Sequence, residues 1–249
     1  MDLYGIIGKP LTHSFSPRFF SDKFQKEKID AEYVKFEIPD ISQISDIVKD
    51  HSNLRGLNVT IPYKESIIPF LDKLDPQAED IGAINVVKFQ RIGGNLQLIG
   101  YNSDILGFQN SISPLLNKDM HKQALILGTG GASKAVAKAL ENLGVGYTFV
   151  SRNPKSAGLT YDDLDEDVLV KNKVIINTTP LGTYPKVDEA VDIPYQYISD
   201  KHLLYDLVYN PSETKFLALG KARGATIKNG AEMLELQALA SWDIWAKEL

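Results

Sequence analysis

Short apolar runs alternate with stretches of helical spacing along the whole chain, and this pattern is typical of an α/β fold. In the first hundred residues we expect strands at 3–8, 31–39 and 54–60, and helices at 16–29, 40–50 and, with a proline interruption, 64–74. Ser16 is expected to cap the first helix, with Pro17 at its first position. Apolar runs at 84–90 and 95–102 flank two glycines and predict a hairpin. Together these elements predict a mainly parallel sheet with helices on it.

A second alternation begins near residue 104, with strands expected at 122–128, 146–152, 174–179, 203–209 and 225–230 and helices at 131–144 and 211–224. The segment between Arg152 and Val174 is short and acidic, so we expect a stunted helix or a loop there. The tail 231–249 predicts a long helix with an apolar face. We therefore expect two domains. Residues 1–103 and the terminal helix 231–249 form the first domain, and residues 104–230 form the second.

The clearest motif is LILGTGGASKAVAKAL, in which a buried strand runs through a glycine turn into a helix. Gly128 permits the tight turn, and Gly130 lets the backbone approach a pyrophosphate at the positive end of the helix. Ser133 replaces the third glycine of the usual fingerprint and is still small enough for close packing. This context predicts a Rossmann-like dinucleotide-binding domain. The alternative is a glycine-rich turn without a ligand.

The strand after this helix ends in Ser151-Arg152-Asn153, where NAD-binding units usually carry a carboxylate for the ribose hydroxyl. Arg152 can pair with a 2′-phosphate, which a carboxylate would repel. The cofactor predicted from the second domain is therefore NADP. A solvent-facing arginine at the end of a strand is the alternative.

In the first domain, polar side chains stand at the ends of predicted strands, where open α/β sheets bind their ligands. Ser14 and Ser16 lie on a turn into a helix and suit a carboxylate, although a turn residue and a helix cap explain them better when these residues are taken alone. Lysine free in water has a pKa of ~10.4, and burial can lower that pKa toward the range of general acid–base catalysis. Lys64 and Asp104 have opposite charges and could pair. Such a pair is either catalytic or a surface salt bridge, and the residues alone leave both interpretations open. The remaining polar residues at these strand ends are Asn58, Thr60, Lys64, Asn85 and Asp104.

Composition narrows the classes of function. The net charge of −5 over 249 residues argues against a nucleic-acid partner, since phosphate binding needs a concentrated basic face. The absence of cysteine excludes disulfides and thiolate chemistry. The four histidines are scattered, so no metal site is predicted and each is expected on the surface or in a loop. No signal peptide or apolar run of membrane-spanning length is read, which makes the cytoplasm the expected compartment.

The chain resembles the shikimate dehydrogenases, because SFSP, NVTIPYK, GAIN, YNSD, GTGGASKA, NTTPLG, DLVYNP and NGAEMLELQA occur in that family's order and spacing. The resemblance covers nearly the whole chain. It implies an α/β substrate domain and a Rossmann domain with a cleft between them. It also implies NADPH-dependent reduction of 3-dehydroshikimate to shikimate in the route to aromatic amino acids. It also implies a small-molecule substrate, with a monomer or homodimer as the expected assembly.

The same resemblance implies a role for each matching residue. Lys64 and Asp104 match the catalytic pair, and Lys64 would give a proton to the forming alkoxide. The substrate-binding residues would be Ser14, Ser16, Thr60, Asn85, Tyr209 and Gln237. The cofactor-binding residues would be Gly128, Thr129, Gly130, Gly131, Ala132, Ser151, Arg152, Asn153, Thr178, Thr179, Leu207 and Gly230.

The chain departs from the family pattern at three places. Ser151-Arg152-Asn153 stands where Asn-Arg-Thr is frequent, and Lys134 stands where Arg is frequent. YNSD replaces the usual Asn-Thr-Asp. Two alternatives of function follow: a quinate/shikimate dehydrogenase of broader specificity, and a non-catalytic NADP-binding regulator, which would be expected to lose Lys64 or Asp104. A purely structural α/β domain is disfavoured by the glycine turn.

Overall fold

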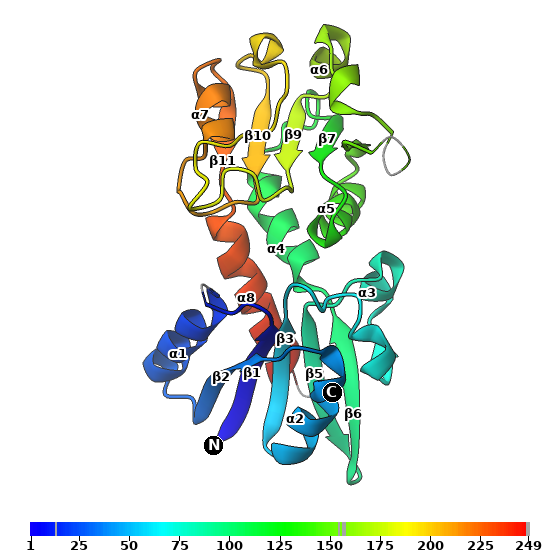
Figure 1. Cartoon of the computed structure of the whole chain (residues 1–249), viewed down its shortest axis with the longest axis vertical. Helices are drawn as coiled ribbons and strands as arrows, with labels where there is room; N and C mark the ends of the chain where they lie inside the picture. Colours follow the sequence, from blue (N-terminus) through cyan, green and yellow to red (C-terminus); the bar gives the residue numbers. More distant parts are fainter. Residues whose placement is uncertain (13, 154, 156–157, 248–249) are drawn as a thin grey trace. The chain divides into compact units, whose positions relative to one another are not determined.

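The computed structural model describes residues 1–12, 14–153, 155 and 158–247, and its backbone divides into two compact units (Figure 1). The first unit consists of Met1–Leu106 and Gln237–Leu249, and the second of Gly107–Leu236. The division falls inside helix α4 (Ser103–Ile112) and inside helix α8 (Ala231–Ala246). The expected terminal helix therefore ends at Ala246, and residues 248–249 lie outside the described part of the chain.

The first unit contains a six-stranded mixed sheet in the order β2-β1-β3-β5-β6-β4. Strand β1 pairs in parallel with β2 and β3, while β5 runs antiparallel to both β3 and β6. The predicted hairpin is therefore confirmed, and it adds antiparallel strands to a parallel β2-β1-β3 core. The six strands are β1 (Asp2–Gly8), β2 (Ala31–Glu37), β3 (Leu54–Val59), β4 (Lys73–Leu74), β5 (Val86–Ile92) and β6 (Asn95–Tyr101).

Apolar residues on the two faces of this sheet pack against different helices. Along β1 the side chains alternate, so Leu3 and Ile7 enter one cluster while Tyr4 and Ile6 enter the other. The Tyr4 face is covered by α1 (Ser16–Glu27) and the C-terminal part of α8, through Phe20 among others. The opposite face is covered by α2 (Ile44–Asp50) and α3 (Pro76–Ile81). Each fully buried side chain of this size stabilises the fold by about 1.5–3 kcal/mol.

Trp245 fixes the end of α8 against the sheet. Its indole N–H donates to the carbonyl oxygen of Val87 at 3.1 Å. A Cβ atom on Gly56 would lie 2.3 Å from the same indole nitrogen, so the tryptophan can reach the sheet only over a glycine. This contact holds the C-terminal half of α8, and with it Gln237, in a set position over β3 and β5.

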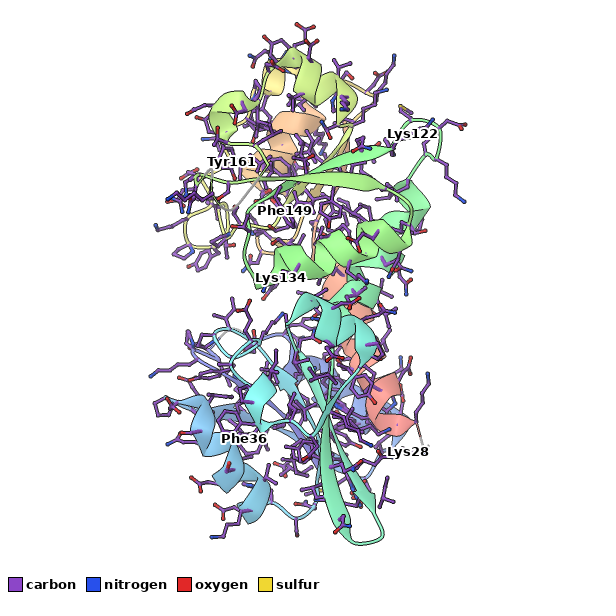
Figure 2. All side chains as sticks on the ribbon, turned by 90° about the vertical axis from the view of Figure 1, so that its right-hand side faces the viewer. Lys28, Phe36, Lys122, Lys134, Phe149 and Tyr161 are labelled. Atoms are coloured by element: carbon purple, nitrogen blue, oxygen red, sulfur yellow. The ribbon has the colours of Figure 1, made fainter. Side chains whose placement is uncertain are left out.

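The second unit contains a five-stranded sheet in the order β11-β10-β9-β7-β8, and all of its strand pairs are parallel. Its apolar core includes Leu125, Ile175 and Leu204 from three adjacent strands. Figure 2 shows Phe149 on β8 and Lys134 at the beginning of α5. The strands are β7 (Gln123–Leu127), β8 (Gly146–Val150), β9 (Val174–Asn177), β10 (Leu203–Asp206) and β11 (Thr226–Lys228). The remaining helices are α5 (Gly131–Asn142), α6 (Glu166–Lys171) and α7 (Lys215–Lys221).

The acidic segment after Arg152 is short, as expected. It forms a 3-10 turn at Tyr161–Asp163 and the six-residue helix α6 in place of a full crossover helix. Leu159 pairs in parallel with the end of the edge strand β8. Ser151 N–H donates to the carbonyl oxygen of Leu159, and Leu159 N–H donates to the carbonyl oxygen of Phe149.

Two expectations about local structure are wrong. Helix α1 begins at Ser16, with Phe15 as the capping residue, and among the described residues no side chain accepts from its first turn. The Ser16 hydroxyl lies instead against Tyr33. The stretch 64–74 forms turns, a 3-10 turn at Ile68–Phe70 and the short strand β4, because the proline interrupts any longer helix.

The described histidines lie in loops, as expected, but two of them are not on the surface. His121 and His202 are buried, and each ring nitrogen has a backbone partner. Burial lowers the pKa of both imidazoles, against the opposing effect of their hydrogen bonds to backbone carbonyl oxygens. His51 is only partly buried, and His13 lies outside the described residues.

Candidate active site

Lys64 and Asp104 form an ion pair in the first unit. Lys64 lies in the turn that follows β3 and Pro62, and its carbonyl oxygen accepts from Ile84 N–H at 2.7 Å, which ties the turn to the segment before β5. The ammonium donates to Asp104 Oδ2 at 2.6 Å. The side chains of Lys64 and Asp104 are only 20% and 5% exposed, so this pair differs from the fully solvated salt bridges that contribute little. The Lys64 side chain thus keeps part of its surface accessible.

Asn85 fixes the carboxylate of Asp104. Its amide nitrogen donates to Asp104 Oδ1 at 2.9 Å, so both carboxylate oxygens have a donor. The amide of Asn85 has one possible orientation, because its oxygen accepts from the backbone N–H of Ser103 at 2.7 Å. Asp104 lies in the first turn of α4, where a negative charge is favoured, and its own N–H donates to Asn102 Oδ1 at 3.0 Å.

Gln237 joins this group from α8. Its side-chain oxygen lies 3.4 Å from the amide nitrogen of Asn85, so residues 152 positions apart in the sequence meet at one place. Thr60 is half-buried directly after β3, and its N–H donates to the carbonyl oxygen of Ile7 at 3.0 Å. The structure thus brings together Lys64, Asn85, Asp104 and Gln237 of the predicted substrate site.

The two serines at the start of α1 have different surroundings. Both are half-buried, and Ser16 lies close enough to Tyr33 to affect its phenol. Burial raises the pKa of Tyr33 well above its usual value, and the nearby Ser16 hydroxyl lowers that pKa in part. Tyr33 donates to Asn58 Oδ1 at 2.7 Å. Its one hydrogen is therefore committed, so the Tyr33 oxygen can meet the Ser16 hydroxyl only as an acceptor.

Sequence reasoning missed Tyr33, Ser103 and Ser241, and it named Asn58 without giving it a role. All four are buried and hydrogen-bonded to one another or to Asn85. Two signals were available in the sequence. Ser103 directly precedes Asp104, and Ser241 lies one helical turn after Gln237 and thus on the same face of α8.

The glycine turn of the second unit can hold a pyrophosphate. Gly128 has φ +106°, a conformation that other residues rarely adopt, and its N–H donates to the carbonyl oxygen of Val150 at 2.8 Å. Gly130 is the N-cap of α5, a helix of 12 residues. Cβ atoms on Gly130 and Gly131 would meet nothing within 4 Å, so the backbone here faces open space. Ser133 closes the turn by donating to the carbonyl oxygen of Gly130 at 2.6 Å. The predicted residue Thr129 belongs to the same turn, and Ala132 is the second residue of α5.

The predicted 2′-phosphate residues form the exposed turn after β8. Arg152 and Asn153 are exposed, Ser151 is half-buried, and the Ser151 hydroxyl accepts from Asn153 N–H at 3.2 Å. Arg152 is close enough to Tyr161 to lower the pKa of its phenol, although burial raises that pKa by more. The exposed guanidinium stands where NAD-binding units usually carry a carboxylate for the ribose hydroxyl. A guanidinium at this position suits a phosphate instead.

The residues predicted around the nicotinamide follow the carboxyl ends of strands β9, β10 and β11. Thr178 donates through its hydroxyl to the carbonyl oxygen of Leu127 at 2.8 Å. A Cβ atom on Gly230 would lie 2.1 Å from the carbonyl oxygen of Leu207, so these two predicted residues are neighbours. Tyr209 follows β10 and is 39% exposed. Its expected role at the substrate carboxylate stays a prediction.

Asp206 at the end of β10 is a further buried carboxylate, which the sequence did not indicate. It accepts from Asn177 Nδ2 at 3.0 Å and from Val208 N–H at 3.0 Å, and it also accepts from the hydroxyl of Thr214. Burial raises its pKa to about 6, against the opposing effect of these bonds. Asn177 holds Thr179 through two hydrogen bonds of 3.0 Å and 2.7 Å. Asp206 therefore organises the loops at the ends of both strands.

Within the described residues, no three acidic or histidine side chains lie close enough together to hold a metal ion. None of the helices in that part of the chain is long and apolar enough to cross a membrane.

The second unit is a parallel α/β unit with an open glycine turn, and the first unit carries a lysine–carboxylate pair. Together they define the class of nicotinamide-dinucleotide-dependent oxidoreductases. Comparison with known proteins narrows the class. A family profile described as the shikimate dehydrogenase substrate binding domain matches residues 6–87. The shikimate dehydrogenase (NADP(+)) of Methanococcus maripaludis is 37% identical over 264 residues, which cover 98% of this chain and 91% of that protein.

Two solved structures agree. The crystal structure of shikimate dehydrogenase from Aquifex aeolicus has a TM-score of 0.85 and 34% identity, and the match covers 99% of this chain and 92% of that one. The structure of shikimate 5-dehydrogenase from Thermus thermophilus in complex with NADP(H) and shikimate has a TM-score of 0.85 and 27% identity, covering 100% and 95% of the two chains. The chain belongs to the shikimate dehydrogenase family.

Proposed function

We propose that the chain catalyses the reversible NADPH-dependent reduction of 3-dehydroshikimate to shikimate in the route to aromatic amino acids. The observation that carries this proposal is the Lys64–Asp104 ion pair at 2.6 Å, which is held by Asn85 at positions that match the family's motifs. The relatives named for NADP(+) and the structure solved with NADP(H) and shikimate support the cofactor and the substrate.

In the reduction, bound NADPH supplies a hydride to the carbonyl carbon of the substrate. The carbonyl oxygen gains negative charge as this bond forms, and Lys64 donates a proton to it, so that the products are an alcohol and NADP⁺. The positive ammonium also stabilises the developing alkoxide. Asp104 orients the ammonium, and Asn85 orients Asp104, so the proton donor is placed before the substrate arrives.

The remaining predicted residues are proposed to bind the ligands. Thr60, Asn85 and Gln237 would hold substrate hydroxyls, and Ser14, Ser16 and Tyr209 would hold the carboxylate. In the second unit, the backbone of 128–132 would bind the pyrophosphate. The residues at 151–153 would bind the 2′-phosphate, and Thr178, Leu207 and Gly230 would line the nicotinamide site.

Two finer points are also proposals. We expect a cytoplasmic enzyme that works as a monomer or homodimer without a nucleic-acid partner, consistent with its net charge of −5. Light scattering on the purified protein measures the assembly, and fractionation of cells measures the compartment.

The first test is an initial-rate assay at 340 nm in the oxidation direction, with shikimate and quinate each combined with NADP⁺ and NAD⁺. Turnover of shikimate with NADP⁺ alone is expected. Turnover of quinate at a comparable kcat/KM would favour the broader quinate/shikimate dehydrogenase. Absence of turnover with all four pairs, in a protein that still binds NADPH, would favour the non-catalytic regulator and overturn the proposal.

A further inference from the structure

A continuous chain of buried hydrogen bonds runs through the first unit behind the residues proposed to touch the substrate. It leads from Tyr33 through Asn58 Oδ1 at 2.7 Å, and from Asn58 Nδ2 to the hydroxyl of Ser241 at 3.0 Å. The hydroxyls of Ser241 and Ser103 lie 3.1 Å apart, and the amide nitrogen of Asn85 lies 3.1 Å from the hydroxyl of Ser103. The chain thus connects β2, β3, α8 and α4 with the amide that orients Asp104.

Backbone groups at three points decide which atoms donate. The Asn58 amide nitrogen lies 3.4 Å from the carbonyl oxygen of Asn85, so it must be the donor and the Asn58 oxygen must accept from Tyr33. Ser241 donates its single hydrogen to the carbonyl oxygen of Gln237 at 2.8 Å. Ser103 must therefore supply the hydrogen between the two serine oxygens.

The third backbone group orients Asn85. Its side-chain oxygen accepts from Ser103 N–H at 2.7 Å, so its nitrogen faces Asp104 and the hydroxyl of Ser103. The Ser103 hydroxyl also lies 3.3 Å from the Asn85 oxygen. Without the Ser241 oxygen as an acceptor, the Ser103 hydroxyl would turn fully to the Asn85 oxygen. It would then no longer be held between Ser241 and Asn85. These bond directions place Ser241 at the centre of the hydrogen-bonded series. Its hydroxyl donates one hydrogen bond and accepts two.

We propose that Ser241 is a positioning residue of the substrate site, which fixes the amide of Asn85 through Ser103 and the amide of Asn58 directly. This inference rests on the proposed function. Ser241 is 1% exposed and follows Gln237 by one helical turn. The same face of α8 therefore carries Gln237, which is proposed to bind the substrate, and Ser241, which supports the side chains around it.

The consequence for catalysis comes from the geometry of Asp104. Its oxygens bind Lys64 and Asn85, so a tilt of the Asn85 amide moves the carboxylate and with it the ammonium. Proton transfer depends steeply on the position of the donor, and small displacements by distant residues can lower rates by up to about 100-fold. Ser241 is expected to affect the turnover step more than the binding of NADP, whose predicted site lies in the other unit.

The test compares Ser241→Ala with Ser111→Ala in the full-length protein. Ser111 is a matched control because it is also 1% exposed, donates to the carbonyl oxygen of Phe108 at 3.0 Å and has a second hydroxyl partner, Tyr205, at 2.6 Å, all within the second unit. Ser241→Ala is expected to lower kcat/KM for shikimate by about 5- to 100-fold with an unchanged KM for NADP⁺. Ser111→Ala is expected to lower the melting temperature similarly and leave kcat/KM within about twofold.

Ser103→Ala provides a second route to the same answer if Ser241→Ala folds poorly. Because both serines act through Asn85, the kinetic losses of the double variant should be smaller than the product of the single losses. Wild-type kcat/KM in a folded Ser241→Ala or Ser103→Ala protein would overturn the inference. Absence of shikimate turnover in the wild-type protein would instead overturn the proposed function, so the two failures are distinguishable.

Discussion

The replacement Lys64→Ala tests the proposed proton transfer directly. Removing a general acid typically lowers kcat by about 10²–10⁴-fold. Here the carboxylate of Asp104 remains, held by Asn85 and only 5% exposed, and it would face the developing alkoxide without the ammonium between them. We therefore expect a loss in kcat of about 10³-fold or more, with a smaller change in KM because the interaction matters mainly in the transition state.

The same change has a bounded cost in stability. Removing one partner of a buried ion pair typically destabilises a protein by about 3–5 kcal/mol. Lys64 is 20% exposed and Asp104 keeps its bond from Asn85, so we expect about 1–3 kcal/mol at this site. A melting curve therefore separates a folded, inactive variant from an unfolded one.

The assay is single-turnover reduction of 3-dehydroshikimate with excess enzyme and NADPH, with and without ethylamine. The truncated side chain leaves room for a small amine, which should restore part of the rate in a concentration-dependent manner. Lys23→Ala is the matched control, because Lys23 also forms a 2.7 Å ion pair in the same unit, with Glu27, and is 12% exposed. Its kcat should equal that of the wild type.

Two results would refute this reasoning. If Lys64→Ala raised KM for the substrate and left kcat within about tenfold, Lys64 would only bind the ligand. If ethylamine failed to raise the rate of a folded variant while the control remained active, the loss would have to arise from something other than the missing proton donor.

Three further predictions follow from the structure. Arg152→Asp is expected to raise KM for NADP⁺ by about 10- to 100-fold and to improve the use of NAD⁺, since a charge-assisted hydrogen bond contributes about 1.5–3 kcal/mol; an unchanged cofactor ratio would make Arg152 a surface charge. Ser14→Ala is expected to raise KM for shikimate more than Ser16→Ala, because the Ser16 hydroxyl also lies near the phenol of Tyr33; equal effects would contradict this. The pKa of His202 is lowered by burial, so its contribution to stability is complete above about pH 6.5 and is lost as the pH falls below that value. Asp206, with its pKa raised to about 6, acts in the opposite direction, so the measurement is the difference in melting temperature between His202→Gln and the wild type from pH 7.5 to 5.5. The variant should lose less stability than the wild type, and parallel curves would count against this assignment.

Periodicity predicted the elements that have long apolar patterns. The strands of both sheets except β4, the hairpin and helix α5 follow from alternation and from the glycine turn, because local sequence determines these features. Helix α1 begins at residue 16, as expected, but its cap was wrong, because Ser16 is a good capping residue in isolation and only the fold brings it near Tyr33. Helix propensity was likewise overridden in 64–74, where a proline and the short strand β4 break the segment.

The candidate site was predictable to the level of strand ends. Asn85, Asp104 and Lys64 were expected to lie together because open α/β sheets gather polar residues at the carboxyl ends of their strands, and the structure gives the distances that sequence could not. The buried carboxylate Asp206 left no such signal, since its partners are 8 and 29 residues away and include a backbone N–H group.

The orientation of side-chain amides is the information that sequence lacks most. Asn58 and Asn85 could each point in two directions, and what decides between them is a backbone carbonyl or N–H group from another part of the first unit. Asn58 and Ser241 are 183 residues apart, and their bond depends on Trp245 fixing α8 over Gly56. A tryptophan near the C-terminus therefore contributes to the geometry of the Lys64–Asp104 pair through three hydrogen-bonded side chains, Ser241, Ser103 and Asn85. Function in this protein is encoded in residues that never touch the substrate as well as in those proposed to do so.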